Sequence, residues 1–283
     1  MAGILALNKD AFGDVVDFLV REQARPERNI AYIGTERDAI AAELADFEPG
    51  WAHAAHGVRD DRGRLVALAY GEWDTGLGRL WVHGPWVAGD DGAWEQWAKP
   101  VLQAVIAAAP SIADIELSGT IENVRLGALA NAIGFERSEP NYVLCVPLDG
   151  PTPERDPSVV DATADDLAWI TPLHDAEFPA TYATPQQLLD GDGVFVAIDH
   201  GYAAGRVAPD GSGYIDFVAV DGSARGAGRG RRLVQELVSR LAEAGAEREV
   251  CLTVQEHRVA ARELYASLGF RIEIVIVGYR RKE

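Results

Sequence analysis

The feature that most constrains this chain is an internal repeat with a constant spacing of 135 residues. The stretch from Asp114 to Phe135 reads DIELSGTIENVRLGALANAIGF, and the stretch from Glu249 to Phe270 reads EVCLTVQEHRVAARELYASLGF. Aligned at that spacing, 114 to 249 and 135 to 270, the two stretches keep their apolar positions in register across a strand, a helix and a closing Gly-Phe turn. The repeat therefore predicts a duplicated domain.

The boundary between the two copies is predicted from a proline-rich segment. Residues 147–157 read PLDGPTPERDP. Proline removes a backbone donor and disfavours helix in the residue before it, so this run is typical of an exposed linker. We expect a first domain over residues 1–148, a linker over 149–157 and a second domain over 158–283.

Hydrophobic periodicity predicts an α/β fold of the α+β type, with a mixed sheet in each of two tandem domains. In the second half we expect strands over 159–161, 193–198, 202–207, 214–220, 249–254 and 271–279, and helices near 165–174, 230–244 and 259–268. In the first half we expect helices over 12–23, 36–45, 93–108 and 124–132, and strands over 52–58, 65–73, 80–87, 112–117 and 142–146.

Charge, hydropathy and cysteine content exclude several classes of protein. The 26 Lys and Arg against 44 Asp and Glu give a net charge of −18, which argues against a nucleic-acid partner because such binding needs a broad basic surface. No apolar run approaches the ~18 residues of a membrane span and no signal peptide is recognised, so we expect a cytoplasmic protein without a membrane partner. Cys145 and Cys251 lie in apolar segments, so we expect reduced core thiols without a disulfide or a metal site.

The segment that carries the most chemistry reads YIDFVAVDGSARGAGRGRRL, from Tyr214 to Leu233. A strand is expected to end at Val220, followed by a Gly/Arg loop and a helix. Glycines bring backbone amides close to a ligand, and a helix start adds free N–H groups and the positive end of a dipole. Such a loop suits a pyrophosphate, and a surface loop with solvated arginines is the alternative.

Two blocks of residues give the second half a resemblance to the GNAT superfamily of acetyl-CoA-dependent N-acetyltransferases. Arg225, Gly228 and Gly230 match the family loop Arg/Gln-x-x-Gly-x-Gly/Ala. A later block, Ala-x-x-Leu-Tyr leading to Gly-Phe, is matched from Ala261 to Phe270. The two blocks occur in the family order, and the resemblance covers residues 158–283.

The resemblance implies acetyl-CoA as the acetyl donor. The backbone of Val218, Ala219 and Val220 would pair with the pantetheine arm. The pyrophosphate would be held by the amides of Arg225, Gly226, Ala227, Gly228, Arg229, Gly230 and Arg231. Tyr265 stands where many relatives carry the tyrosine that protonates the departing thiolate of CoA. Packing of its helix against the sheet is the alternative role for Tyr265.

Two positions depart from the family pattern. Arg258 stands where many relatives carry an asparagine that contacts the cofactor, and Thr253 stands where some carry a glutamate base. Asp216 is our preferred candidate base, because it interrupts an apolar strand on the face shared by alternate residues. Glu256 and His257 are second choices. A strand-edge or substrate-anchoring role is the alternative for Asp216.

In this fold the first helices and their connection form part of the acceptor mouth. Glu177 could attract a cationic amine there, and Phe178 and Tyr182 could form the walls of its site. An ordinary helix end and turn is the alternative interpretation.

The first half repeats the scaffold without the loop. Its corresponding segment reads AGDDGAW, with Asp90 and Asp91 where a pyrophosphate would lie, and like charges repel. Ala130 occupies the place that Tyr265 has in the second half. We therefore interpret residues 1–148 as a degenerate GNAT-like domain.

These observations predict an acyltransferase whose second domain moves acetyl from acetyl-CoA to a primary amine of a small molecule or peptide. The amine would attack directly in a ternary complex, since neither cysteine has an adjacent base for covalent catalysis. The protein would act as a monomer or homodimer. The alternatives are a non-catalytic acyl-CoA-binding, sensing or interaction protein, and an enzyme that uses a longer acyl-CoA.

Overall fold

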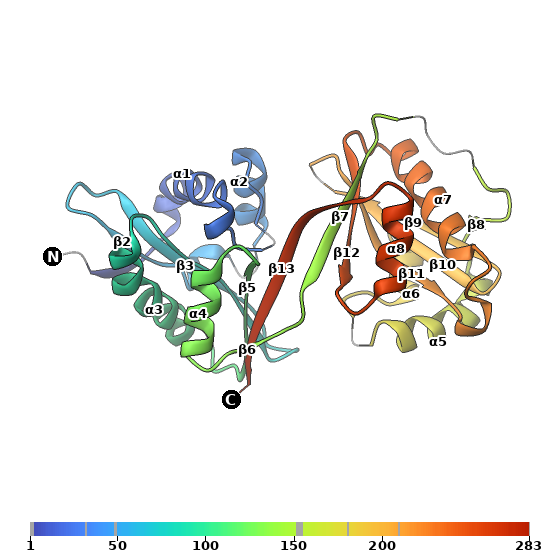
Figure 1. Ribbon diagram of the computed structural model, residues 1–283. Coiled ribbons are helices and arrows are strands. Elements are labelled where there is room, and N and C mark those ends of the chain that lie inside the picture. The colour runs from blue at the N-terminus through green and yellow to red at the C-terminus, as the bar shows by residue number, and fades with distance from the viewer. Residues whose placement is uncertain are drawn as a thin grey trace. The chain divides into compact units, whose positions relative to one another are not determined.

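The structure is a computed structural model that describes residues 3–31, 33–47, 50–150, 155–179, 181–208 and 210–282. Its contacts divide the chain into two compact units (Figure 1). Unit 1 comprises Met1–Pro140 together with Val275–Glu283, and unit 2 comprises Asn141–Ile274. Residues 151–154 of the expected linker lie outside the described residues.

Unit 1 is built on a mixed sheet with the strand order β1-β2-β3-β4-β5-β13, in which only β4 and β5 are parallel. The strands are β1 (Ile4–Ala6), β2 (His56–Arg59), β3 (Leu65–Asp74), β4 (Arg79–Val87), β5 (Asp114–Thr120), the short β6 (Glu136–Arg137) and β13 (Arg271–Lys282). The helices are α1 (Phe12–Gln23), α2 (Arg37–Asp46), α3 (Asp91–Ala108) and α4 (Val124–Ala132).

Helical periodicity explains how α1 and α3 cover this sheet. In α1 the fully buried positions include Val15, Phe18 and Leu19, which recur at the spacing of one helix face. In α3 the buried residues Ala98, Val101, Leu102 and Val105 do the same. Both helices pack against β3 and β4, and their apolar faces join one core cluster.

Unit 2 repeats this plan with the strand order β7-β12-β11-β10-β9-β8, in which only β11 and β12 are parallel. The strands are β7 (Asn141–Pro147), β8 (Val160–Asp161), β9 (Val194–Ile198), β10 (Gly201–Val207), β11 (Gly213–Val220) and β12 (Glu249–Gln255). The helices are α5 (Leu167–Glu177), α6 (Pro185–Asp190), α7 (Arg229–Glu243) and α8 (Val259–Ser267).

Alternation along the strands of unit 2 separates two cores on opposite faces of the sheet. Val196 and Ile215 belong to the cluster formed with α7 and α8. Phe195, Tyr202 and Phe217 belong to the cluster formed with α5 and α6. Successive residues of a strand point to opposite faces of the sheet, so these residues fall into two clusters. Helices cover both faces, and most of the central strands are therefore buried.

The final strand of each repeat lies in the sheet of the other unit. β7 ends the first repeat in sequence, yet all seven of its residues pair with β12 in unit 2. β13 ends the second repeat, yet Ile276–Lys282 pair with β5 in unit 1. Figure 1 shows β13 beside β5 and β7 beside β12. The domain boundaries expected at residues 148 and 158 divide the sequence into its two repeats and stay a prediction, since the two units are defined by contacts.

Most predicted elements are present with small shifts in their ends, and α1 has the predicted bounds. The expected strand over 52–58 is an exception. Its first part is a single turn of 3₁₀ helix at Trp51–His53, with Trp51 buried, and only His56–Arg59 forms a strand. The fold class, a mixed α/β architecture in tandem, is as predicted.

The expectation of reduced thiols is wrong. Cys145 and Cys251 are directly opposite residues of β7 and β12 and form a disulfide. The sequence analysis missed it because the two cysteines are 106 residues apart and become neighbours only through the strand exchange. Disulfides persist mainly in oxidising compartments, so cysteine usage no longer supports the cytoplasmic expectation. Among the described residues, no helix is long and apolar enough to cross a membrane.

Replacing both cysteines, Cys145→Ala with Cys251→Ala, should lower the free energy of unfolding by about 2–4 kcal/mol. The bridge closes a loop with a sequence separation of 106 residues, and its loss frees the unfolded chain. Urea unfolding of the oxidised protein and the double variant measures this difference. Mass spectrometry after alkylation without reductant is the control. Two alkylated thiols in the folded wild-type protein would contradict the disulfide.

Candidate functional site

The parallel strands β11 and β12 separate after three pairs. Gly213, Tyr214 and Ile215 pair with Val250, Cys251 and Leu252, and the ladder between the two strands ends there. At the same point the β10–β11 register shifts, so that Asp216 has no partner on β10. Such a β-bulge bends a strand and often lies beside a functional site. The backbone of residues 216–220 that faces β12 is therefore left outside the ladder, where an extended ligand could pair with it.

Beyond β11 the chain forms a glycine loop that opens onto the start of α7. Gly226 and Gly228 have φ angles of 81° and 76°, a left-handed conformation that favours glycine. A Cβ atom at either position would have nothing within 4 Å, so the space beside both glycines is open. Gly228 is the N-cap of α7 and no side chain caps this helix. The first amides of α7 are thus available to an anion.

The arginine side chains of this loop are bound to the protein itself. Arg225 donates to Glu177 Oε1 at 2.5 Å and to the Val220 carbonyl at 3.0 Å. Arg229 donates to the Asp199 carbonyl at 2.9 Å, and Arg231 donates to Ser267 Oγ at 2.7 Å. The loop therefore offers its amides to a ligand, while its arginines tie it to neighbouring elements.

Glu177 bridges two arginines at the end of α5. Besides the ion pair with Arg225, its Oε2 lies 3.4 Å from Arg258 Nη1, and its carbonyl accepts from Arg258 Nη2 at 3.0 Å. The Arg258 guanidinium also lies 5.7 Å from the ring centre of Phe178. Glu177, expected on the acceptor side, thus joins the glycine loop to the start of α8.

Asp216 and Tyr182 are in direct contact. Asp216 Oδ1 accepts hydrogen bonds from the Tyr182 hydroxyl and from Arg206, while its Oδ2 has no partner among the described residues. The Asp216 side chain is only 4% exposed. Tyr182 is 66% exposed, and partial desolvation of its hydroxyl together with the hydrogen bond to Asp216 and the Asp216 charge raises its pKa, so the phenol keeps its proton and donates. The rings of Tyr182, Phe178 and Phe217 form one aromatic wall, with centroids 5.0–5.3 Å apart.

Tyr265 lies on α8 in the core beneath the loop. It is 8% exposed and its ring contacts Phe270. Burial raises the pKa of Tyr265 to about 12, against a smaller opposite effect of Arg258. The hydroxyl therefore carries its proton at neutral pH, as a general acid must. No described hydrogen bond or ion pair joins Tyr265 to Asp216.

A buried histidine that was not expected as a site residue lies behind the aromatic wall. His174 Nε2 lies 3.0 Å from the Ala183 carbonyl, and its Nδ1 lies 2.6 Å from the Tyr202 hydroxyl. A carbonyl only accepts, so Nε2 carries the hydrogen and Nδ1 accepts from Tyr202. Burial lowers the pKa of His174, partly offset by Ala183 and Asp175. The neutral ring thus holds the backbone at Ala183, the residue that follows Tyr182.

Two further residues of the site, Arg206 and Phe217, were also missed. Alternation would place Phe217 on the face opposite Asp216, and the irregularity at Asp216 leaves both residues in contact with Tyr182. Arg206 reaches Asp216 through the β10–β11 pairing, which a single strand pattern does not reveal.

In unit 1 the corresponding gap between parallel strands is filled by the chain itself. β4 and β5 pair only over Arg79–Val82 and Asp114–Leu117. Beyond that point the Ala31 amide donates to the Ser118 carbonyl at 3.4 Å, and the Thr120 amide donates to the Asn29 carbonyl at 3.3 Å. Ile30 between them is fully buried. We call residues 29–31 the plug.

The plug is held by one buried glutamine. Gln23 Nε2 donates to the carbonyls of Ile30 and Ile33 at 3.0 and 2.8 Å. Its Oε1 accepts from the Ile30 amide at 2.8 Å and from Trp86 Nε1 at 2.9 Å. Gln23 is 1% exposed. All three of its polar hydrogen-bonding groups, two N–H and one carbonyl, are thus engaged within unit 1.

The start of α3 is capped where α7 is open. Asp90 is the N-cap, and its carboxylate accepts from the Ala93 amide at 3.0 Å. A carboxylate at this position satisfies the helix end and repels a phosphate. Unit 1 thus lacks both an open slot and an open helix start.

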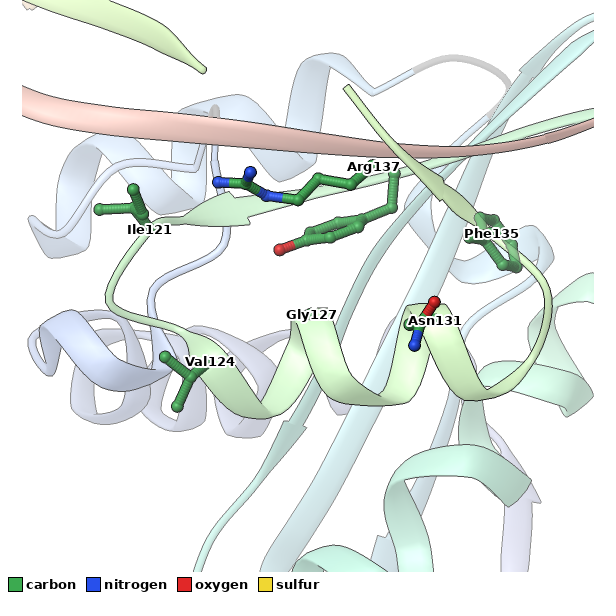
Figure 2. A pocket seen from close by; sticks show the side chains of 7 residues that line it. Ile121, Val124, Gly127, Asn131, Phe135 and Arg137 are labelled. Carbon is green, nitrogen blue, oxygen red and sulfur yellow. The ribbon is translucent and has the colours of Figure 1, made fainter. Parts of the chain in front are cut away.

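Unit 1 has a separate hollow on α4, with a volume of about 420 Å³ (Figure 2). It is lined by Ile121, Val124, Gly127, Asn131, Phe135, Arg137 and Tyr279. A Cβ atom on Gly127 would lie 2.6 Å from the Tyr279 hydroxyl, so the glycine makes room for that phenol. None of the residues that line the hollow belongs to the plug.

Metal-type ligands gather at one place among the described residues, namely Cys145, Glu249 and Cys251. The two sulfurs are joined in the disulfide, which leaves no thiolate to bind an ion.

Gln23→Ala should lower the free energy of unfolding by about 2–4 kcal/mol, because it leaves buried backbone groups of the plug and the Trp86 indole without partners. Urea unfolding measures the loss. The matched control is Gln186→Ala, whose exposed amide contacts only Asp190 and which should change stability by less than about 0.5 kcal/mol. Equal effects of the two substitutions would contradict the role of Gln23.

Comparisons with known proteins agree with this geometry. The family model for the acetyltransferase (GNAT) family matches residues 162–270, the region that contains the glycine loop, α7 and Tyr265. A search of curated proteins found no match.

Solved structures share the fold over the whole chain. A GCN5-related N-acetyltransferase from Sphaerobacter thermophilus aligns with a TM-score of 0.70 and 19% identity, over 99% of this chain and 95% of its own. A tandem GNAT protein from the clavulanic acid biosynthesis pathway aligns with a TM-score of 0.64 and 16% identity, over 100% of this chain and 98% of its own. A further structure, described as an acetyltransferase from Pyrococcus horikoshii, aligns with a TM-score of 0.60 and 13% identity, over 100% of this chain and 89% of its own. Residues 162–270 therefore match the acetyltransferase (GNAT) family, and the whole chain has the fold of tandem GNAT structures.

Proposed function

We propose that unit 2 transfers an acetyl group from acetyl-CoA to a primary amine by direct attack in a ternary complex. The observation that carries this proposal is the continuous path from the gap between β11 and β12 to the glycine loop and the uncapped start of α7. An extended arm fits beside an unpaired strand, and a pyrophosphate fits open amides at a helix start. The family match over residues 162–270 supports acyl-CoA as the donor class.

The donor would be held mainly by backbone groups. The strand residues Val218, Ala219 and Val220 would pair with the arm, and the amides from Arg225 to Arg231 would hold the pyrophosphate. Arg225 now pairs with Glu177, so a phosphate would compete with that carboxylate for its guanidinium. Such an exchange would couple donor binding to the position of α5.

An ammonium acceptor loses two protons on its way to the amide, one to a base at the site and one to water, and one proton is supplied to the departing sulfur. Acetyl-CoA, when bound, supplies a thioester whose C–S bond breaks as the new C–N bond forms. Tyr265 would donate its proton to the sulfur, since its raised pKa keeps the phenol protonated. Asp216 Oδ2, the oxygen without a described partner, would accept the amine proton directly or through water.

The acceptor would lie against the aromatic wall of Phe178, Phe217 and Tyr182. An ammonium group suits this place because aromatic faces and the Asp216 carboxylate both attract cations. Glu177 would contribute to the negative charge around the entrance.

A non-catalytic acyl-CoA-binding role is the second candidate. Two observations favour it: Thr253 stands where some members of the family carry a glutamate base, and Glu177 is paired with two arginines. Release of free CoA thiol with a panel of primary amines separates the two functions, because a binding protein releases none. The same assay with longer acyl-CoA donors tests the chain length.

Gly228→Asp should abolish acetyl-CoA binding, measured by calorimetry, whereas Gly228→Asn should bind within about tenfold of wild type. Asp and Asn both tolerate the left-handed conformation at this position and are similar in size, so the pair isolates the effect of charge. Binding that survives in the Asp variant would contradict a phosphate site at the loop.

Tyr265→Phe should lower kcat by about 100-fold and leave acetyl-CoA binding unchanged, because it removes a proton donor and keeps the ring. Because the pKa of Tyr265 is raised to about 12, the wild-type kcat should show no decline from tyrosine ionisation up to about pH 10. A kcat equal to wild type in the Phe variant would leave the tyrosine with a packing role alone.

A further inference from the structure

Unit 1 contains a buried cluster of aromatic and acidic side chains that the proposed reaction does not use. Tyr70 on β3 and His83 on β4 are opposite residues of the sheet, and their rings stack with centroids 5.1 Å apart. Phe47 meets both rings edge-on, at 5.3 and 5.2 Å. Glu43 on α2 and Glu72 on β3 complete what we call the Tyr70 cluster.

Two polar atoms of the Tyr70 cluster are buried without a hydrogen-bond partner. Tyr70 is fully buried and its hydroxyl has no partner among the described residues. His83 is 8% exposed, and its Nε2 makes no described hydrogen bond but lies 3.6 Å from Glu72 Oε2, an ion pair if the ring is protonated. Leaving such atoms without hydrogen bonds is costly, so a polar group from outside the chain, a water or a ligand, would satisfy them.

The charge of the cluster identifies the class of that partner. Glu43 accepts only the Gly34 amide at 3.4 Å, and no Lys or Arg of the described chain pairs with Glu43 or Glu72. Two carboxylates facing aromatic rings attract a cation. A metal ion is disfavoured, because the converging metal-type ligands of the described chain lie at Cys145, Glu249 and Cys251 instead.

The position in the fold points the same way. The Tyr70–His83 pair precedes a bulge in β4, as the Gly205–Ile215 pair precedes the bulge at Asp216 in β11. Arg206 follows Gly205 in β10 and binds Asp216. In β3 the residue after Tyr70 is Gly71, which has no side chain to supply such a charge. The acids of unit 1 therefore lack the guanidinium present in unit 2.

We propose that the Tyr70 cluster of unit 1 binds a primary ammonium group, whose N–H donors the Glu43 and Glu72 carboxylates and the Tyr70 oxygen accept and whose charge faces the aromatic rings. A quaternary ammonium fits less well because it has no donors for these oxygens. The plug fills the β4–β5 gap, so an amine held here is recognised and not acetylated. The inference is independent of the activity proposed for unit 2.

Binding should strengthen as pH rises through neutrality. Burial raises the pKa of Glu43 to about 7. The hydrogen bond from the Gly34 amide lowers this pKa, and the charge of Glu72 raises it. A cation favours the ionised carboxylate. Since ionised Glu43 rises from about a tenth to about nine tenths between pH 6 and pH 8, affinity should rise about tenfold. The other titratable groups that interact with Glu43 are Glu72 and Tyr70.

The test is calorimetric titration of n-butylammonium chloride into the full chain without CoA, at pH 6 and pH 8. We expect a saturable site that is retained in Asp216→Asn and is stronger by about tenfold at the higher pH, with tetramethylammonium and n-butanol at least about tenfold weaker. Glu72→Gln and Glu43→Gln should each weaken binding at least about tenfold. The matched control Glu95→Gln, an exposed position on α3, should not.

A second variant separates recognition from structure. Tyr70→Phe removes an unpartnered hydroxyl, so it should leave the melting temperature unchanged or raise it while it weakens n-butylammonium binding. Binding that is unchanged in Glu43→Gln, Glu72→Gln and Tyr70→Phe overturns the inference, as does the absence of saturable binding. Loss of binding in Asp216→Asn alone would place the amine in unit 2 and also overturn it.

Discussion

The structure depends on the early end of pairing between two parallel strands. In each unit the parallel ladder covers only three or four residue pairs, and a bulge in one strand turns the rest of it away from its neighbour. Buried backbone N–H and C=O groups need partners, so the gap must be filled by the chain or by something that binds it. The two units satisfy this requirement differently.

Unit 1 fills the gap with its own residues, and unit 2 keeps it open. The plug supplies the hydrogen bonds that Ser118 and Thr120 need, and Gln23 holds it in place. The same division recurs one element later, where Asp90 caps α3 and Gly228 leaves α7 uncapped. The tandem scaffold thus holds a unit whose gap and helix start are closed and a unit in which both are open.

Local patterns predicted much of this architecture, and contacts between distant residues account for what they missed. The bounds of α1 followed from its apolar spacing, and the glycine loop followed from residues adjacent in sequence. The strand exchange could not be predicted, because β7 and β13 are both apolar and either could pair with β5 or β12. Partners distant in sequence, such as Arg280 with Asp114 at 2.5 Å, distinguish the two pairings. The contacts of Arg206 with Asp216 and of the plug with β5 were missed for the same reason, since each joins residues from two segments whose pairing a local pattern does not reveal.

The central claim is that only unit 2 has an open slot for the donor, and hydrogen exchange tests it most directly. Backbone exchange is measured by mass spectrometry with and without saturating acetyl-CoA. The account predicts slower exchange over residues 216–232 and no change over residues 29–31 and 86–94. Equal protection of the corresponding segments in both units, or no protection over residues 216–232, would contradict it.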